Sequence, residues 1–392
     1  MNGFSSPSTT TSLPLILSID TLRLPLTGVG RYTQELALQL VQRHDVDPLF
    51  LQGNRVITHL PTLIGGHPAR QRVRDALSGF SWPVDVYRRI SNQRRCHALR
   101  AYADRVLHGT NYYVPNFKGP TVVTLHDASV LRMPETHRPD RVRFMRKEVA
   151  RSLEQAHLVI TVSEFSRREI AALWGWPLER IRVTPLAPSA VFHRHDEEEL
   201  RRPLARWGLR AQGYSLFLGT VEPRKNLAML LEAYRGLPAA IRHRMPLVVA
   251  GYQGWESEAL HQQLRQAQSE GWAHYLGFVE GEAIPALVAG ARLCAMPSRY
   301  EGFGLPVLEA MASGVPVLSS TAEALREVGG TAALYVDPAD REGWTQGLEV
   351  LLQDDQQCAE LGRSGLRRAA DFSWQDCAER TVAAYRETFH AR

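Results

Sequence analysis

Short apolar runs recur along the chain, and each is bounded by glycine, proline or a cluster of polar residues. Such runs, rich in valine, isoleucine and leucine, are typical of strands buried on both faces. Between them apolar residues recur at helical spacing, as Tyr32, Leu36 and Leu40 do. This alternation predicts parallel, doubly wound α/β sheets. The predicted strands are residues 13–19, 105–107, 122–127, 158–162, 181–185, 216–219, 247–251, 275–279, 292–296, 317–318 and 334–338.

Helix boundaries have signals of their own. Ser166 and Glu169 have the spacing of a capping box, so a helix is expected to begin there and to end at Gly175. The stretch 136–155 predicts a strongly basic helix. For this helix, and for the arginines between residues 88 and 100, two interpretations stay open. One is an ordinary solvated or packed helix face, and the other is contact with anionic lipid headgroups or a phosphate-bearing acceptor.

Domain organisation follows from length and from one change in composition. The chain has 392 residues, which suggests two or three domains at about 100–200 residues each. Between residues 187 and 212 it turns polar and charged, as expected of a boundary. We therefore expect one domain over 1–195, a second over 196–371 and a helical segment over 372–392.

Composition and charge indicate an ordinary globular protein, with 44% hydrophobic residues and a net charge of +5. The chain shows no secretory signal pattern and no apolar run near the roughly 20 residues that span a bilayer. Its four cysteines lack metal-ligand spacing, as expected of free thiols in a reducing cytoplasm. We expect a cytoplasmic protein, with peripheral contact at the inner membrane as an open alternative.

The stretch 298–320 carries the clearest chemistry. It predicts a strand, a loop with Gly302 and Gly304, a helix that starts near Pro306, and a further strand. The glycines leave backbone N–H groups unshielded, and the helix N-terminus favours an anion or sugar hydroxyls. Glu301 and Glu309 are acceptors suited to pairs of hydroxyls, although their spacing alone favours a solvated helix glutamate for Glu309.

Other candidates lie where predicted strands end, which is where open α/β sheets bind ligands. Arg224 and Lys225 precede a helix and suit a diphosphate, although residue type alone favours a surface pair. His126 ends another strand, where a structural histidine is the simpler interpretation. Gly28 and Gly30 form a turn before a helix, but the pair is no full G-x-G-x-x-G match and a plain turn is equally consistent.

Four strings taken together resemble the retaining glycosyltransferases of family 4. They are E-G-F-G-L-P-x-L-E-A from Glu301, G-T-x-E-P-R-K-N from Gly219, T-G-V-G-R-Y from Thr27 and T-L-H-D from Thr124. The resemblance implies the GT-B fold, with two Rossmann-like, doubly wound parallel-sheet domains facing across a cleft. It also implies that the last helix crosses back onto the first domain.

The resemblance assigns roles to particular residues. It implies that Arg224 and Lys225 grip the donor diphosphate, and that His126 reaches the donor sugar near its anomeric centre. Glu301 would hold that sugar, and Glu309 the nucleotide ribose. Gly28 and Gly30 would lie near the diphosphate and the reacting centre, and Phe278 and Val279 near the nucleobase. The other donor-binding positions are Gly219 and the loop residues Phe303, Gly304 and Leu305.

The implied reaction moves a hexose from a nucleotide-diphosphate donor to an acceptor hydroxyl with retention of configuration. The strings look most like bacterial mannosyl- or rhamnosyltransferases of polysaccharide and O-antigen assembly, which suggests GDP-mannose or a related GDP-sugar as donor and a glycan or lipid-linked glycan as acceptor. No Asp-x-Asp motif stands in a suitable loop, so no metal cofactor is expected. A UDP- or ADP-sugar donor, or a non-catalytic sugar-nucleotide-binding protein, stays an alternative.

Two other classes fit the sequence poorly. The basic residues lack the interleaved aromatics and the modules of nucleic-acid-binding proteins, so no nucleic acid partner is expected. A nicotinamide-dependent oxidoreductase needs the full glycine fingerprint and a following acid, and neither half of the chain has them.

Overall fold

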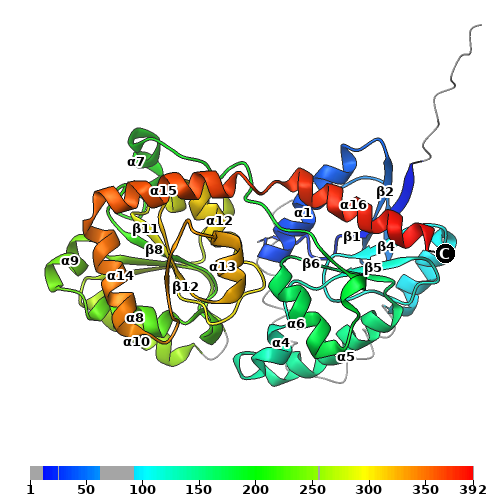
Figure 1. Ribbon diagram of the computed structural model, residues 1–392, viewed down its shortest axis with the longest axis horizontal. Helices are drawn as coiled ribbons and strands as arrows, with labels where there is room; N and C mark the ends of the chain where they lie inside the picture. The colour runs from blue at the N-terminus through cyan, green and yellow to red at the C-terminus, as the bar shows by residue number, and fades with distance from the viewer. Residues whose placement is uncertain (1–11, 25, 62–91, 255–256, 392) are drawn as a thin grey trace, which may run out of the picture. The chain divides into compact units, whose positions relative to one another are not determined.

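The computed structural model describes residues 12–24, 26–61, 92–254 and 257–391. Within it the chain forms two compact units (Figure 1). Unit 1 holds residues 1–125, 148–160 and 378–392, and unit 2 holds residues 126–147 and 161–377. Each unit is described by itself below, and the predicted domain boundaries stay predictions. Arg88 and Arg89, two of the arginines between residues 88 and 100, lie outside the described residues.

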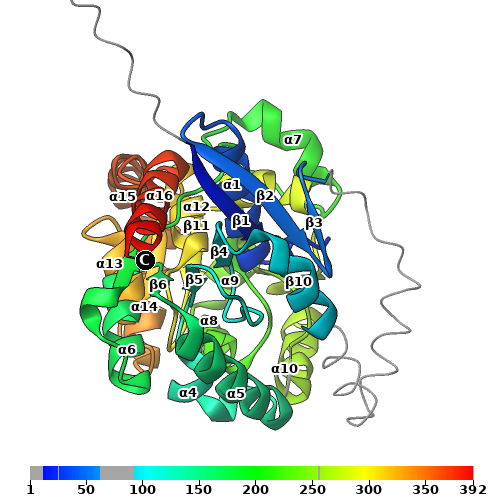
Figure 2. The same cartoon turned by 90° about the vertical axis from the view of Figure 1, so that its right-hand side faces the viewer.

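The first sheet has seven strands in the order β3-β2-β1-β4-β5-β6-β7. Parallel pairs join β2 to β1, β1 to β4, β4 to β5 and β5 to β6. At one edge β3 pairs antiparallel with β2, which lies beside β1 (Figure 2). Neither β2 nor β3 was predicted from the sequence, because Asp47 and Pro48 interrupt the apolar pattern of β2. The strands are β1 Leu13–Ser18, β2 Val46–Gln52, β3 Arg55–Ile57, β4 Val106–Gly109, β5 Thr121–Thr124, β6 Leu158–Thr161 and β7 Ile181–Val183.

The second sheet has six strands in the order β10-β9-β8-β11-β12-β13, and every pair in it is parallel. Chain order reverses between β8 and β11, so their carboxyl ends flank a topological switch point. The predicted α/β class with doubly wound parallel sheets is confirmed. The strands are β8 Ser215–Leu218, β9 Leu247–Ala250, β10 Ala273–Gly277, β11 Leu293–Met296, β12 Val317–Ser320 and β13 Leu334–Val336.

Helices connect the strands of both sheets. One predicted boundary is wrong: the helix after β6 begins at Glu164, and Ser163 caps it by accepting from the Ser166 N–H. Gly175 ends that helix in the left-handed conformation, as predicted. Among the described residues no helix combines the length and the apolar character that crossing a bilayer requires.

The helices are α1 Gly28–Val41, α4 Ser129–Arg132, α5 Pro139–Gln155, α6 Glu164–Trp174, α7 Glu197–Ala205, α8 Leu227–Arg235, α9 Ala239–Arg244, α10 Glu258–Ser269, α11 Ile284–Ala289, α12 Leu305–Ala312, α13 Glu323–Gly329, α14 Arg341–Gln353, α15 Asp355–Ala369 and α16 Trp374–His390.

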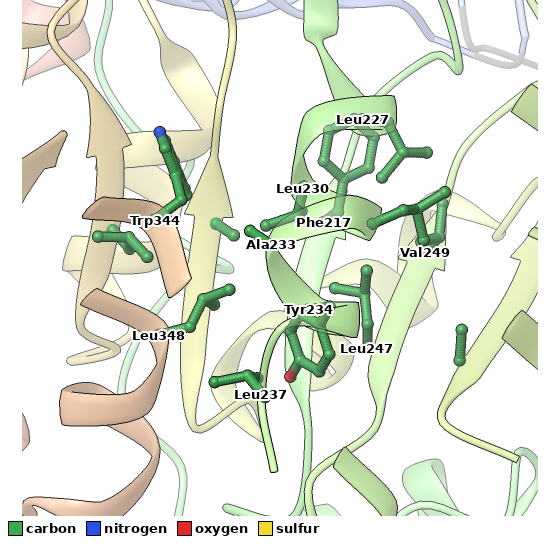
Figure 3. Packing of buried hydrophobic residues seen from close by; sticks show 14 of the residues in the cluster. Phe217, Leu227, Leu230, Ala233, Tyr234, Leu237, Leu247, Val249, Trp344 and Leu348 are labelled. Atoms are coloured by element: carbon green, nitrogen blue, oxygen red, sulfur yellow. The ribbon is translucent and has the colours of Figure 1, made fainter. Parts of the chain in front are cut away.

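The core of unit 2 forms where α8 and α14 pack on the second sheet (Figure 3). Leu227, Leu230 and Tyr234 of α8 point inward, at the helical spacing that the sequence predicts. The buried Tyr234 hydroxyl lies 2.6 Å from Ser215 Oγ and 2.9 Å from the Met245 carbonyl oxygen. The contact with Ser215 anchors α8 at the amino end of β8.

A buried polar network joins four elements of unit 1. His108 on β4 lies 2.6 Å from the Tyr385 hydroxyl of α16 and 2.8 Å from Thr124 Oγ1 at the end of β5. The Tyr32 hydroxyl of α1 lies 3.0 Å from the same threonine oxygen. Because every polar group finds a partner, the network fixes these elements without leaving an unpaired buried dipole.

One of the arginines between residues 88 and 100 forms an ion pair within the protein. Arg95 lies 2.7 Å from an Asp20 carboxylate oxygen and donates to the Gly53 carbonyl at 2.8 Å. Its side chain is 13% exposed, so the interpretation as a solvated helix face is wrong for this residue.

Candidate active site

The candidate site lies in unit 2 at the carboxyl ends of β8 and β11. A one-turn helix after β8, Pro223–Lys225, presents Arg224 and Lys225. The loop after β11 carries Glu301. Asn226 ties the two loops together, because its side-chain amide donates to the Pro297 carbonyl at 3.1 Å and to the Pro338 carbonyl at 2.8 Å. Sequence reasoning assigned Asn226 no role, since neither partner is near it in sequence.

Three charged groups meet in this site. Glu301 Oε1 lies 2.5 Å from Lys225 Nζ, and Glu301 Oε2 lies 2.9 Å from Arg224 Nη1. Burial alone would raise the pKa of Glu301, but Lys225 and Arg224 outweigh it and lower that pKa from 4.5 to about 2. The carboxylate is therefore ionised at neutral pH and forms ion pairs with both cations.

Arg224 retains capacity for a ligand. Its Nη1 also donates to the Tyr300 carbonyl at 2.7 Å, and its Nη2 to Glu222 at 2.7 Å. Its buried Nε has no hydrogen-bond partner within the described part of the chain. An unpaired buried donor is costly, and an anionic oxygen would satisfy it. The interpretation of Arg224 and Lys225 as a surface pair is wrong, since their side chains are only 12% and 13% exposed.

The glycine loop and α12 form the other side of the site. Gly304 takes the N-cap position with φ 111°, and no side chain caps the helix. A Cβ on Gly302 would lie 2.1 Å from the His126 carbonyl oxygen, so that position requires glycine. Pro306 has no N–H, and the Val307 N–H donates to the Gly304 carbonyl at 2.9 Å, so of the first three residues of α12 Leu305 is the one that offers an N–H to an anion or to sugar hydroxyls.

The remaining loop and helix candidates lie on the same motif. Phe303 is buried, and Leu305 is half-buried at the first position of α12. Glu309 lies one turn further along α12 and is 3% exposed. The interpretation of Glu309 as a solvated helix glutamate is therefore wrong, because a buried carboxylate in this helix needs a specific reason to be retained.

His126 lies two residues beyond β5 and in the same unit as the glycine loop. Its backbone faces Gly302, as the close approach of its carbonyl oxygen shows. The next residue, Asp127, accepts from the backbone N–H of Ser129 at 2.9 Å and from its hydroxyl at 2.7 Å. These bonds fix the turn that carries His126.

An exposed aromatic pair follows β9 and β10. Phe278 and Tyr252 are each 44% exposed, and their rings stack 4.5 Å apart at 16°. Val279, the residue after Phe278, is buried. A flat aromatic surface suits a nucleobase, which agrees with the predicted role of Phe278. Tyr252 was missed, although its place just after β9 is the signal that could have found it.

The glycine positions differ in environment. A Cβ on Gly219, at the end of β8, would lie 3.7 Å from Lys225 Cε, so the backbone approaches the cation closely. Gly28 and Gly30 belong to unit 1, where Gly28 begins α1 and the Gly30 N–H donates to Thr27 Oγ1 at 3.3 Å. Their role at the donor diphosphate stays a prediction.

Among the described residues, no group of three or more His, Cys, Asp or Glu side chains is placed to hold a metal ion. The expectation of a metal-independent reaction stays a prediction.

Comparisons with known proteins agree with this geometry. The family model described as Glycosyltransferase Family 4 matches residues 26–187, and the model described as Glycosyl transferases group 1 matches residues 208–368. The O-antigen chain mannosyltransferase B of Escherichia coli is 40% identical over 95% of this chain and 100% of that protein. The MMP alpha-(1->4)-mannosyltransferase of Mycolicibacterium hassiacum is 32% identical over 62% of this chain and 56% of its own.

Solved structures show the same fold. WaaG, a glycosyltransferase involved in lipopolysaccharide biosynthesis, aligns with a TM-score of 0.69 at 16% identity over 95% of this chain and 99% of its own. The sucrose-phosphate synthase of Thermosynechococcus elongatus aligns with a TM-score of 0.69 at 21% identity over 97% of this chain and 100% of its own. At these identities the likeness establishes the fold, which is GT-B.

Proposed function

The chain belongs to glycosyltransferase family 4 and is a glycosyltransferase, and we propose that it transfers mannose, or a deoxyhexose such as rhamnose, from a GDP-linked donor to a growing glycan. The observation that carries the proposal is the cluster of Arg224, Lys225 and Glu301 beside the uncapped start of α12. The extent of the similarity to a mannosyltransferase of O-antigen chains supports the choice of sugar.

In the proposed mechanism the two cations hold the donor diphosphate and stabilise the negative charge that grows on it as it leaves. The bond from the anomeric carbon to the diphosphate oxygen breaks, and the acceptor hydroxyl bonds to the same face of the sugar. The proton of that hydroxyl passes to the departing diphosphate oxygen. Glu301 accepts from sugar hydroxyls once the diphosphate has taken over its cations. Because Arg224 and Lys225 supply the positive charge, we propose that no metal is required.

The acceptor proposed is a lipid-linked glycan, met by a cytoplasmic enzyme at the inner face of the membrane. Support comes from α5, where Arg141, Arg143, Arg146 and Lys147 are all exposed. Sedimentation with anionic and with neutral vesicles tests this point. Replacement of these four residues by glutamine is expected to abolish binding to anionic vesicles, and equal sedimentation with neutral vesicles would contradict the electrostatic basis.

The function is tested first by thermal stabilisation with GDP, UDP, ADP and their sugars, with EDTA present. A ligand that binds only the folded state must raise the unfolding temperature. We expect a shift with GDP-mannose or a related GDP-sugar that is lost in Lys225→Ala and in Glu309→Ala. The donor found is then used in a transfer assay, which separates an enzyme from a non-catalytic binder. A UDP preference would overturn the mannosyl assignment, and no shift with any nucleotide would overturn the donor site.

A further inference from the structure

We propose that Ser163 and Ser166, at the start of α6, are positioning residues that set the orientation of the donor loop, defined here as residues 298–304. The proposal rests on the donor site described above. Neither serine has been connected with that site by motif or by similarity. Both side chains are fully buried, at 0% exposure, so their hydroxyls must find partners within the protein.

Both hydroxyls converge on one atom of the donor loop. Ser163 Oγ donates to the Gly302 carbonyl oxygen at 2.6 Å, and Ser166 Oγ donates to the same oxygen at 3.0 Å. A carbonyl oxygen has two lone pairs and can accept both bonds. Ser166 Oγ also lies 3.5 Å from the His126 carbonyl oxygen. Ser166 therefore lies between the glycine loop and the turn that carries His126.

The Gly302 carbonyl matters because of the group on the other side of its peptide bond. The peptide unit is planar and trans, so a fixed C=O direction also fixes the direction of the Phe303 N–H. That N–H is one of the groups predicted to hold the donor sugar. Glycine has no side chain that would limit rotation of this peptide, so the orientation must be imposed from outside. The two serines supply that restraint.

Neighbouring contacts give the serines a firm base. Glu327 of α13 accepts from the backbone N–H groups of Glu164 and Phe165 at 2.8 and 2.9 Å, which anchors the first turn of α6. The Tyr300 hydroxyl accepts from the Ala128 N–H at 3.2 Å. The Phe165 ring meets the Tyr300 ring edge-on, with centroids 5.5 Å apart. Direct contacts thus link the donor loop, the His126 turn and the start of α6.

A purely structural role has to be separated from a positioning role. Ser163 also caps α6, because its oxygen accepts from the Ser166 N–H at 3.0 Å. Its hydroxyl proton remains available for Gly302, so the two roles coexist in that residue. The Ser166 hydroxyl has no part in the cap. Ser166→Ala therefore removes a loop restraint and leaves the helix cap in place.

The test compares Ser166→Ala with Ser166→Thr, which keeps the hydroxyl, and with Ser152→Ala. Ser152 is a matched control, since it is also fully buried on a helix and its Oγ accepts from the Val114 N–H at 3.1 Å in unit 1. For each protein we measure kcat, the KM for the donor, and the affinities for GDP and for GDP-mannose, or for the nucleotide and sugar nucleotide that the wild type selects.

We expect Ser166→Ala to bind the nucleotide as the wild type does, but to lose about tenfold or more in kcat and in the gain of affinity that the sugar provides. Ser166→Thr should retain both quantities, and Ser152→Ala should lower only the unfolding temperature. A change in unfolding temperature alone in Ser166→Ala would overturn the positioning role. If Ser166→Ala does not fold, Ser163→Ala is compared with Ser163→Thr, which keeps the hydroxyl, by the same measurements. A wild type that binds no sugar nucleotide would instead refute the proposed function itself.

Discussion

Two helices of this molecule start beside a pair of glycines. Gly28 and Gly30 lie within the first turn of α1 in unit 1, and not in a turn before it as predicted, whereas Gly302 and Gly304 precede α12 in unit 2. They differ in what satisfies the first N–H groups of the helix. Before α1 the Thr27 hydroxyl accepts from the Gly30 N–H, so the turn closes on itself. Before α12 the cap position is Gly304, and no side chain takes that part. The start of α1 is capped by a side chain, whereas no side chain among the described residues caps the start of α12.

The start of α12 also differs from that of α1 in having buried charged residues beside it. The α12 turn has Arg224, Lys225 and Glu301 beside it. All three side chains are nearly buried, and Glu301 forms an ion pair with each of the two cations. Buried charges are expensive to retain, so their presence indicates a site rather than a solvated loop. A glycine turn therefore predicts a binding site only when no acceptor at the cap position competes for the helix N–H groups.

The largest expected effect comes from Arg224→Ala. In the proposed mechanism this cation stabilises the leaving diphosphate, so its loss should lower transfer about 100- to 1000-fold. The control is Arg235→Ala, an exposed arginine on α8 of the same unit, which should transfer sugar at the wild-type rate. Steady-state transfer assays on both variants decide the point. A loss of similar size in Arg235→Ala would mean that overall charge, and not the site, governs the rate.

The next effect concerns Glu301 and pH. Its pKa of about 2 in the folded protein lies below the ordinary 4.5, so its contribution to stability is complete above about pH 4.5. This contribution should disappear as the pH falls from 4.5 towards 2, because the unfolded chain binds the proton more tightly. Urea unfolding at several pH values measures the slope. Glu301→Gln should be less stable at pH 7 and should lack this component, and an identical pH slope in both proteins would contradict the ion pairs.

A pair of glycine variants sharpens the comparison. A Cβ on Gly302 would lie 2.1 Å from the His126 carbonyl oxygen, whereas a Cβ on Gly28 would meet nothing within 4 Å. Gly302→Ala should therefore lower the free energy of unfolding by about 1–3 kcal/mol and impair transfer. Gly28→Ala should change it by no more than about 0.5 kcal/mol. A fall in transfer with unchanged stability in Gly28→Ala would support its predicted place at the diphosphate, and equal stability of both variants would contradict the close packing.

Sequence patterns predicted the strands and the loops of the candidate site well, for a physical reason. Apolar runs of strand length and glycine-to-helix turns are local features, and the carboxyl ends of parallel strands bring such loops together. Arg224, Lys225 and Glu301 were predicted to act together, and the structure places them in contact. The burial of Glu309 was not evident from its spacing, because a helix surface pattern does not reveal what covers it.

What the sequence did not reveal depends on contacts between distant residues. Ser163 meets Gly302 across 139 positions of the chain, and no local pattern marks that pairing. The start of α6 was misplaced for a related reason. Ser163 has a hydroxyl as suitable for capping as that of Ser166, and it lies three residues earlier. Tertiary contacts selected between two local options that sequence alone could not rank.

The smallest expected effect tests the closed turn directly. Thr27→Ala removes the side-chain acceptor of the Gly30 N–H, and loss of such a cap lowers the free energy of unfolding by about 1 kcal/mol. Thr27→Ser keeps the hydroxyl and should restore most of that loss. Urea unfolding measures both variants, and nucleotide affinity should change in neither by more than about twofold, because the Thr27 oxygen is already engaged by the Gly30 N–H. If Thr27→Ala left stability unchanged but weakened nucleotide binding, the α1 turn would be an open site like that of α12, and the contrast between the two turns would fail.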